Sequence, residues 1–493
     1  MSLPTPTRRV SSEVRSPTSM VATGHPLAAR AAHQMLVRGG SAVDAAVAAD
    51  ALLGVVEPMA TGIGGDLLAM LVLPDGSAHS YNGTGRAPAG LDVGRIADMP
   101  GQRVPERHVL SITTPGAVQG WHDLHQRLGR LPWAELFAPA IALATEGFAV
   151  APVAAREWAL FAPVLRADAT AARLYRADAP PAVGERWANP ELAALLAAIA
   201  RVGPDAFYRG AIADAAARAV QAHGGVLSAD DLAAHRGDFQ RPLASHFRGL
   251  EVLECPPNTH GLAVLHALDA LEPLALDPSD PRTTLQMVEA MDAALRHARR
   301  TVADPAGNTV CTVVVDRDGL AITLMSSVFK RFGSGIAVPG GGFALQNRGH
   351  GFSAPGHVNG PAPGKRPYHT VVPAAVRRDG RFHAGLGVVG GAMQPQGHVQ
   401  LLTRLAAWGE PLQAAIDAPR WRLEADRALA LEAGTPAAIE RAVRAAGYAE
   451  PAGLGELGGR SDFGGAQVVL RDPVSGDLLG GSDRRKDGCA LAG

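Results

Sequence analysis

Two runs of β-branched residues form the clearest short-range pattern in the chain. Residues 309–316 and 320–328 are rich in Val, Thr and Ile, and an Arg-Asp-Gly turn at 317–319 separates them. Such runs on either side of an Asp-Gly predict a β-hairpin. Its first strand should begin at or next to Thr309, directly after the Gly-Asn pair at 307–308. A hydroxyl group is therefore predicted at the mouth of a strand.

The N-terminal half carries helical patterns. Residues 27–38 are rich in Ala, Leu and Met and are followed by two glycines, which predicts a helix and its end. Ser41 with Asp44 three residues later is typical of a capping box, and the very apolar helix that follows should be buried nearly all round. A strand is predicted over 67–73, and residues 111–300 indicate a mainly helical region.

A pair of glycines follows another predicted strand. Val388 and Val389 are followed by Gly390, Gly391 and the start of a helix. Two adjacent glycine N–H groups at a strand-to-helix turn can point the same way because no Cβ obstructs them, which is the geometry that an oxyanion hole requires. Glycine pairs also make ordinary turns, so the residues alone leave both interpretations open.

Thr309 carries candidate chemistry of its own. If the chain is cut just before this threonine, the freed α-amine lies within reach of the same residue's hydroxyl and can act as its general base. An α-amine titrates near ~8, so a useful fraction accepts a proton at neutral pH. Threonine is also common in strands, so the pattern by itself does not separate the two roles.

Composition excludes several kinds of partner. The chain has 493 residues, 47% of them hydrophobic, and a formal charge of −1. This length and hydrophobic content are sufficient for a sizeable core. The balanced charge predicts neither a nucleic acid nor an anionic membrane as partner. No apolar stretch approaches the ~20 residues of a transmembrane helix.

Location and ligands follow from similar arguments. Residues 1–19 indicate a loose leader without the apolar run of a signal peptide, and Cys255, Cys311 and Cys489 are an odd count typical of free thiols. Both observations favour a cytoplasmic protein. Histidines 350, 357, 369, 383 and 398 lack metal-ligand spacing, and the glycine loop at 62–65 lacks the Lys of a P-loop, so we expect no metal and no cofactor.

Several motifs together resemble one family. The hairpin at Thr309, the stretch 332–336, the pair Gly390-Gly391 and the segments 54–58 and 62–65 resemble the γ-glutamyltransferase family of N-terminal-nucleophile hydrolases. The resemblance implies a four-layer αββα sandwich. It also implies a precursor that cuts itself between Asn308 and Thr309 into a large subunit, 20–308, and a small subunit, 309–493.

The resemblance assigns roles to individual residues. Thr309 would be the nucleophile, Gly390 and Gly391 would bind the oxyanion, and Ser327 would support the nucleophile from the position of a family threonine. Cys311 lies two residues along the same strand and is a rival nucleophile, but no chain end activates it.

The chain departs from the family where a γ-glutamyl head would bind. Thr84 replaces the arginine that holds the α-carboxylate, with Arg86 two positions away, and Phe329 replaces an asparagine. His369-Thr370 stands for a Ser-Ser pair, and His350-Gly351 stands for the acids that would meet the ammonium. Arg86, Arg348, His350 and His369 therefore predict a pocket for an anion without a counter-charge for an ammonium.

Three function classes stay open. The first is a self-processing amidohydrolase for an oxamate-like or other anionic or acyl amide, as in the oxamate amidohydrolase and acylase branch. The second is a γ-glutamyl hydrolase or transferase for glutathione-like compounds, and the third is a non-catalytic scaffold. The expected partners are a small amide and the two subunits of one precursor, and a higher oligomer is left open.

Overall fold

The computed structural model describes residues 13–302, 308–424, 427–451 and 460–493. The expected leader therefore falls mostly outside the described residues, as do residues 303–307, which precede the predicted cleavage site. Val14–Ser16, within the expected leader, form strand β1 and pair with β17, so this part of the segment belongs to a sheet.

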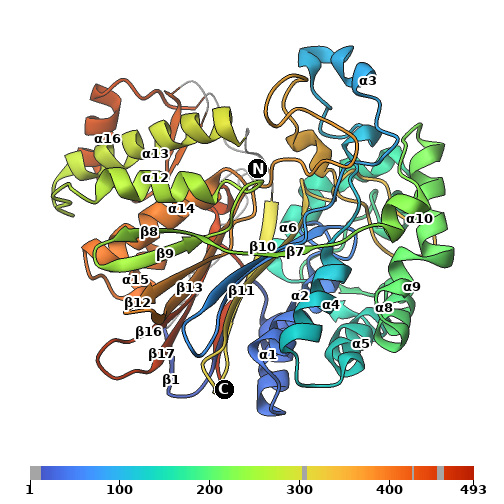
Figure 1. Cartoon of the computed structure of the whole chain (residues 1–493), viewed down its shortest axis with the longest axis horizontal. Coiled ribbons are helices and arrows are strands. Elements are labelled where there is room, and N and C mark those ends of the chain that lie inside the picture. The colour runs from blue at the N-terminus through green and yellow to red at the C-terminus, as the bar shows by residue number, and fades with distance from the viewer. Residues whose placement is uncertain (1–12, 303–307, 425–426, 452–459) are drawn as a thin grey trace.

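Two seven-stranded sheets form the centre of the molecule (Figure 1). The first, sheet A, has the order β1, β17 (Leu478–Ser482), β16 (Gly465–Arg471), β13 (Arg381–Val389), β12 (Ala374–Arg378), β9 (Leu250–Glu254) and β8 (Leu243–Phe247). The second, sheet B, has the order β18 (Cys489–Ala492), β2 (Met20–Thr23), β10 (Asn308–Val315), β11 (Ala321–Phe329), β3 (Asp66–Val72), β4 (Ala78–Asn82) and β7 (Asp238–Gln240). Neighbouring strands run antiparallel in both sheets.

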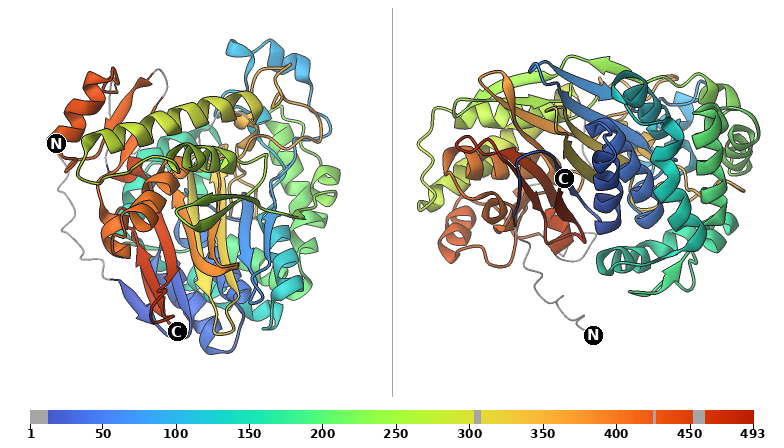
Figure 2. Two further views of the ribbon diagram at one scale, coloured as in Figure 1. Left: turned by 60° about the vertical axis from the view of Figure 1, so that its left-hand side comes forward. Right: turned by 90° about the horizontal axis from the view of Figure 1, so that it is seen from below.

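Helices cover the outer face of each sheet. Sheet B carries a large layer: α1 (Pro26–Val37), α2 (Ala42–Val56), α4 (Ala117–Leu128), α5 (Ala138–Glu146), α6 (Pro152–Phe161), α8 (Pro190–Val202), α9 (Asp205–Tyr208) and α10 (Gly210–Ala222). Sheet A carries α12 (Gly261–Leu271), α13 (Pro281–Thr301), α14 (Met393–Leu402), α15 (Leu412–Asp417) and α16 (Ala437–Ala445). Figure 2 shows the two helical layers on opposite sides of the sheets. The fold is a four-layer αββα sandwich, as expected.

Smaller elements complete the chain. The described residues also form the helices α3 (Val93–Ala97), α7 (Ala169–Leu174) and α11 (Ala229–Ala233) and the two-stranded pairs β5 (Phe148–Ala149) with β6 (Arg186–Trp187) and β14 (Trp421–Leu423) with β15 (Leu429–Leu431).

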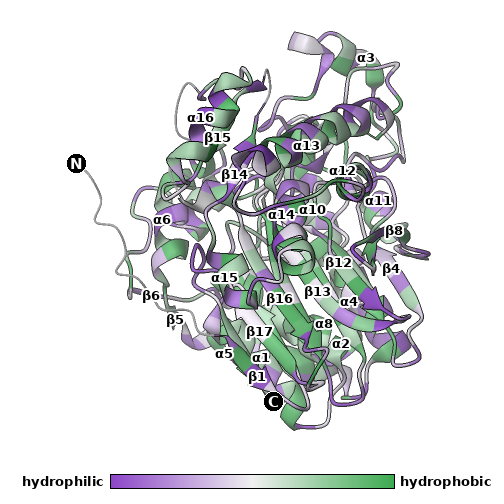
Figure 3. Cartoon of the chain, turned by 90° about the vertical axis from the view of Figure 1, so that its left-hand side faces the viewer, coloured by the Kyte–Doolittle hydropathy of each residue, from purple (hydrophilic) through white to green (hydrophobic). Residues whose placement is uncertain are grey.

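Strand alternation divides the core into layers. Along β10, Val310 and Val314 pack against the helices, whereas Cys311, Val313 and Val315 pack against sheet A. Successive side chains of a strand point to opposite faces, so every second residue of β10 reaches the layer between the sheets. Hydrophobic residues also dominate β13, β16 and β17 of sheet A (Figure 3).

Local patterns predicted several elements well. The hairpin of β10 and β11 forms as expected, and Ser41 and Asp44 make both hydrogen bonds of a capping box at the start of α2. All fifteen residues of α2 are buried. The region 111–300 is mainly helical, as expected, and it also contributes the strands β7, β8 and β9 to the two sheets. These three strands are short, with three to five residues each.

Candidate functional site

Thr309 lies at the end of the layer between the two sheets. Its side chain follows Cys311 and Val313 on the face of β10 that packs against sheet A. The pairing of β10 with β11 is irregular here, because Asn308 pairs with Phe329 but Val310 pairs with Ser326. Thr309 is 2% exposed. The hydroxyl therefore lies in a protected position where the strand pairing changes.

Packing between the sheets brings the glycine pair to the same place. A Cβ on Gly385 would lie 2.7 Å from Val313 Cγ1, and a Cβ on Gly387 would lie 2.5 Å from Cys311 Sγ. Two residues further along both strands, the end of β13 thus reaches Thr309. Small residues at these two positions let β13 approach β10 closely.

Gly390 and Gly391 turn the chain from β13 into α14. Their φ angles are 119° and 60°, in the left-handed region that favours glycine. Their carbonyls accept from Met393 N and Gln394 N at 3.0 Å each. Outside the helices and strands of the described residues, neither glycine N–H donates to a backbone carbonyl. The turn therefore places two consecutive glycine N–H groups at the end of β13.

Gln394 makes a direct contact with the candidate nucleophile. Its Nε2 donates a hydrogen bond of 2.7 Å to Thr309 Oγ1, and its Oε1 accepts a hydrogen bond of 3.0 Å from Val372 N. The side chain is fully buried. Sequence reasoning gave this glutamine no role, although its position three residues after the glycine pair places it near the site.

Ser327 and Cys311, the other two side chains predicted near Thr309, have different surroundings. Ser327 lies on the same face of sheet B as Thr309 and its Oγ accepts from Phe329 N at 2.8 Å. Cys311 is 1% exposed within the core between the sheets. Burial raises the pKa of its thiol well above the usual value, so this side chain is held as a neutral thiol and is a poor nucleophile.

The buried carboxylate of Asp66 lies on the strand next to Ser327. Asp66 pairs with Ser327 in the ladder between β3 and β11, and its Oδ1 accepts from Gly85 N and Gln346 Nε2 at 2.8 Å each. Its Oδ2 lies 3.4 Å from Arg348 Nε and 3.3 Å from His369 Nε2. All three ionisable side chains have 0% exposure.

The charges of this cluster compensate one another. Burial alone would raise the pKa of Asp66, but contacts with His369, Arg348 and Gln346 hold it below the usual value. Burial lowers the pKa of Arg348 to about 10 against the opposing effect of Asp66, and burial lowers the pKa of His369 to about 4. The cluster is therefore an Asp⁻–Arg⁺ pair with a neutral imidazole beside it.

This arrangement corrects one expectation. Arg348 and His369 were expected to belong to an anion pocket that has no counter-charge for an ammonium, yet the acid Asp66 lies in contact with both. The Arg348 guanidinium also lies 4.3 Å above the Phe329 ring, and its Nη1 is 3.4 Å from Thr370 Oγ1. Arg348 is a paired, stacked and fully buried cation, and it is not a free anion-binding group.

The sequence pattern of the family described as Gamma-glutamyltranspeptidase matches residues 28–312 and 305–493. The match covers nearly the whole chain. The chain belongs to the γ-glutamyltranspeptidase family. Its four-layer sandwich is the N-terminal-nucleophile hydrolase fold, and it is a hydrolase or transferase by membership, which removes the non-catalytic scaffold from consideration.

The chain is similar along its length to proteins that are named for different activities. The chain is 31% identical to the glutathione hydrolase-like YwrD proenzyme of Bacillus subtilis, over 96% of this chain and 98% of that protein. It is 33% identical to the oxamate amidohydrolase proenzyme of Klebsiella pneumoniae, with the same coverage. The crystal structure of cephalosporin acylase from Bacillus halodurans has a TM-score of 0.93 at 34% identity, covering 100% of this chain and 98% of the other.

The remaining predicted pocket residues have different surroundings. Thr84 is buried near the Asp66 cluster, where its N–H donates to Asn82 Oδ1 at 3.0 Å. Arg86 is exposed, and its guanidinium donates to the Gly364 carbonyl at 3.2 Å. His350 Nδ1 hydrogen bonds to the Val104 carbonyl at 2.7 Å. In the described part of the chain, neither Arg86 nor His350 forms a hydrogen bond or ion pair with Asp66, but the His350 ring lies 6.1 Å from the Phe329 ring on which Arg348 stacks.

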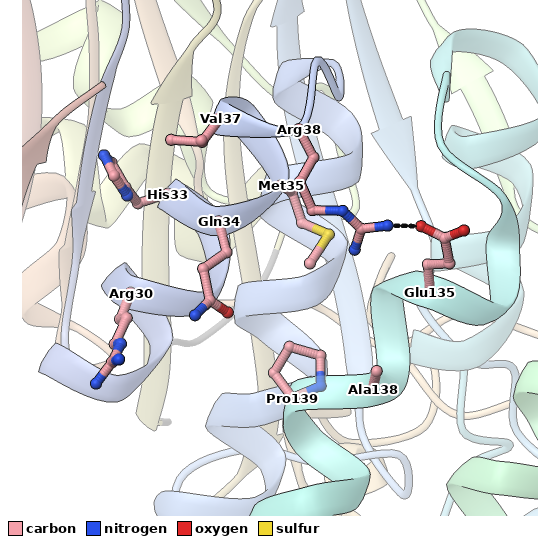
Figure 4. Close-up of a pocket in the computed structure, with 9 residues that line it drawn as sticks. All are labelled: Arg30, His33, Gln34, Met35, Val37, Arg38, Glu135, Ala138 and Pro139. Carbon is pink, nitrogen blue, oxygen red and sulfur yellow. Dashed lines mark ion pairs between the residues drawn. The ribbon is translucent and has the colours of Figure 1, made fainter.

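Other candidate sites have little support. Within the described part of the chain, no group of three or more His, Cys, Asp or Glu side chains could hold a metal ion. The same residues contain no helix long and apolar enough to cross a membrane. A surface hollow of 690 Å³ lies between α1 and α5, where Arg38 and Glu135 form an ion pair (Figure 4). None of the predicted site residues lines this hollow.

Proposed function

We propose that this chain is a self-processing threonine amidohydrolase that is cut between Asn308 and Thr309. The fragments would be a large subunit, 20–308 after a leader, and a small subunit beginning at Thr309. The observation that carries the proposal is the convergence at Thr309 Oγ1 of a side-chain N–H donor from Gln394 and the strand end that bears Gly390 and Gly391. Proenzyme relatives over the whole length support the same conclusion.

The proposed reaction uses one hydroxyl twice. In the precursor, Thr309 Oγ attacks the Asn308 carbonyl carbon, the C–N bond breaks, the hydroxyl proton passes to the freed nitrogen, and water hydrolyses the resulting ester. In turnover, Oγ attacks a substrate amide, and the free α-amine passes the hydroxyl proton to the leaving amine. Water then releases the acid. An oxyanion donor is worth about 3 kcal/mol in other enzymes, which is the contribution expected of Gly390 and Gly391 N–H.

The buried ion pair supports a substrate without an amino-acid head. Thr84, Phe329, His369 and Thr370 occupy the positions that resemble the family's γ-glutamyl pocket, and Asp66 and Arg348 neutralise each other among them. A substrate ammonium or carboxylate would have to separate this pair, and leaving either partner buried alone costs about 3–5 kcal/mol. We infer that the acyl group is small and lacks the α-ammonium, as in an oxamate-like or simple acyl amide.

Any anionic end of the substrate should meet Arg86. This guanidinium is exposed, and in the described part of the chain it has no carboxylate partner within ion-pair distance. With Arg348 already paired, Arg86 is the better candidate for a substrate carboxylate.

A γ-glutamyl hydrolase or transferase is the second candidate. The observation that favours it is Asp66 itself, because it is an acid in the region where an ammonium would bind. Similarity to the glutathione hydrolase-like proenzyme agrees with this alternative.

Intact mass spectrometry tests the processing step. The purified protein should give two polypeptides, one ending at Asn308 and one beginning at Thr309, and Thr309→Ala should give one full-length chain without activity. A fully active preparation that remains a single uncut polypeptide would contradict the proposal.

An amide panel tests the substrate. We expect glutaryl anilide to give at least a tenfold higher kcat/KM than γ-glutamyl anilide, since about 1.4 kcal/mol is sufficient for that factor. Oxamate belongs in the same panel, and Arg86→Ala should weaken use of the anionic substrates. A clear preference for γ-glutamyl anilide that survives Arg86→Ala would establish the second candidate instead.

A further inference from the structure

We propose that Gln394 is a further catalytic residue, which donates its side-chain N–H to Thr309 Oγ throughout the reaction. The proposal rests on Thr309 being the nucleophile. The contact is 2.7 Å long, joins a residue of α14 to a residue of β10, and lies in a fully buried region. Because Gln394 touches the reacting oxygen itself, its effect on the chemistry is direct.

The orientation of the amide group is determined by a second contact. Val372 N–H can only donate, so the atom of Gln394 that lies 3.0 Å from it must be the acceptor Oε1. Exchanging the oxygen and nitrogen would place two donors against each other. Nε2 therefore faces Thr309, and Thr309 Oγ must accept this hydrogen bond.

This direction has a consequence for the hydroxyl. One lone pair of Oγ receives the Gln394 N–H, so the hydroxyl hydrogen must point to another acceptor, which in the cut enzyme is the α-amine of Thr309. Gln394 thereby directs the proton toward the base that removes it. The same N–H stabilises negative charge that develops on Oγ.

The contribution should be largest when Oγ is the leaving group. In deacylation, water adds to the acyl carbon, the bond from that carbon to Oγ breaks, and Oγ recovers a proton through the α-amine. The oxygen carries its greatest negative charge as the bond breaks, and the Gln394 N–H is positioned to stabilise it. Loss of this donor should slow deacylation and leave substrate affinity nearly unchanged.

The same helix offers a matched control. Gln396 is also fully buried, but its Nε2 donates to the Ala392 and Leu423 carbonyls and its Oε1 accepts from Leu423 N. It holds α14 against β14 through backbone groups. A change at Gln396 therefore reports the cost of altering a buried glutamine of α14 without removing a contact to Thr309.

The test compares Gln394→Glu and Gln394→Met with Gln396→Glu. A carboxylate at 394 can accept from Val372 N–H but cannot donate to Thr309, and methionine keeps the size without the donor. We expect both changes at 394 to lower kcat at least tenfold and to slow self-cleavage, with KM falling alongside kcat because deacylation becomes the slow step, while Gln396→Glu changes kcat less than threefold. Acyl-enzyme should accumulate in the 394 variants, as seen by intact mass.

A pH series separates chemistry from structure. A protonated glutamic acid regains a donor, so the ratio of Gln394→Glu to wild-type kcat should rise as the pH falls, whereas the Gln394→Met ratio should stay level. Equal kcat and equal cleavage in the Gln394 and Gln396 variants, or a Gln394→Glu ratio independent of pH, would overturn the role of Gln394. An uncut, inactive wild type would instead overturn the proposed function.

Discussion

Asp66 shows how a single carboxylate can remain ionised while fully buried. Two hydrogen bonds reach one of its oxygens, and Arg348 and His369 contact the other. The last two contacts are 3.3–3.4 Å long and are not well-aligned hydrogen bonds, and of the two partners only Arg348 carries a charge. Removing one partner of such a pair leaves the other charge uncompensated, which is more costly than the pair is favourable.

Asp66→Asn should lower the free energy of unfolding by about 3–5 kcal/mol, because Arg348 is left buried without its counter-charge. Urea unfolding of the uncut Thr309→Ala chain measures this effect on a single polypeptide. Asp178→Asn is the control, since Asp178 is 86% exposed in its pair with Arg166 and should cost at most about 1 kcal/mol. Equal effects of the two changes would mean that the Asp66 pair contributes nothing specific.

At the scale of elements, α14 connects the two halves of the site. Three glutamines on it bind neighbouring segments: Gln394 reaches β10, and Gln396 and Gln400 bind the backbone of β14. Gly397 faces β13, where a Cβ would lie 2.5 Å from Val388 Cγ1. The distance of α14 from β13 therefore sets how Gln394 and the glycine pair meet Thr309.

Gly397→Ala should push α14 away from β13 and lower kcat at least tenfold, with a loss of about 1–3 kcal/mol in stability from overpacking. Shortening the opposing side chain in the double variant Val388→Ala/Gly397→Ala should restore room and recover part of both losses. Steady-state kinetics and thermal unfolding measure the two effects. A double variant as impaired as Gly397→Ala alone would show that the contact with Val388 is not the cause.

The whole molecule buries several imidazoles in the neutral form. Burial lowers the pKa of His235 to about 4 and that of His260 to about 3. Neither ring nitrogen of His235 has a hydrogen-bond partner in the described part of the chain, and its ring stacks on Tyr208 at 5.7 Å. The unfolded chain binds protons at these positions below about pH 6.5, where the folded protein does not. Stability should therefore be full above pH 6.5 and should fall as the pH drops toward 4.

His235→Phe should make stability less dependent on pH. The phenylalanine ring can keep the stacking on Tyr208 but binds no proton. The loss of stability between pH 7 and pH 5 should therefore be about 2 kcal/mol smaller than in the parent chain. Unfolding of the Thr309→Ala chain at both pH values gives the difference, and His246→Gln, at an exposed position, should leave it unchanged. An identical pH dependence in His235→Phe and the parent would exclude His235 as a contributor.

How much of this could be predicted from the sequence depends on the range of the interaction. The hairpin at Thr309 and the capped helix α2 follow from neighbours within a few residues, and the resemblance supplied the fold. The pairing of Asp66 with Arg348 joins positions about 280 residues apart, and no local pattern encodes it. Arg348 was therefore interpreted as a free cation. Gln394 escaped notice because a glutamine on a helix has no distinctive spacing, and its role depends on where α14 meets β10.

The strand order in the two sheets has a consequence for the lifetime of the processed protein. In sheet B, β10, β11 and β18, which belong to the proposed small subunit, lie among β2, β3, β4 and β7 of the proposed large subunit, and sheet A also combines strands from both sides of the proposed cut. Once the chain is cut as proposed, neither polypeptide contains all the strands of either sheet. Complete unfolding would then yield two polypeptides, and recovery would require them to find each other again, at a rate that depends on dilution. In dilute solution, the half-life of the processed enzyme should therefore be set by its unfolding rate, because the separated polypeptides rarely reassociate.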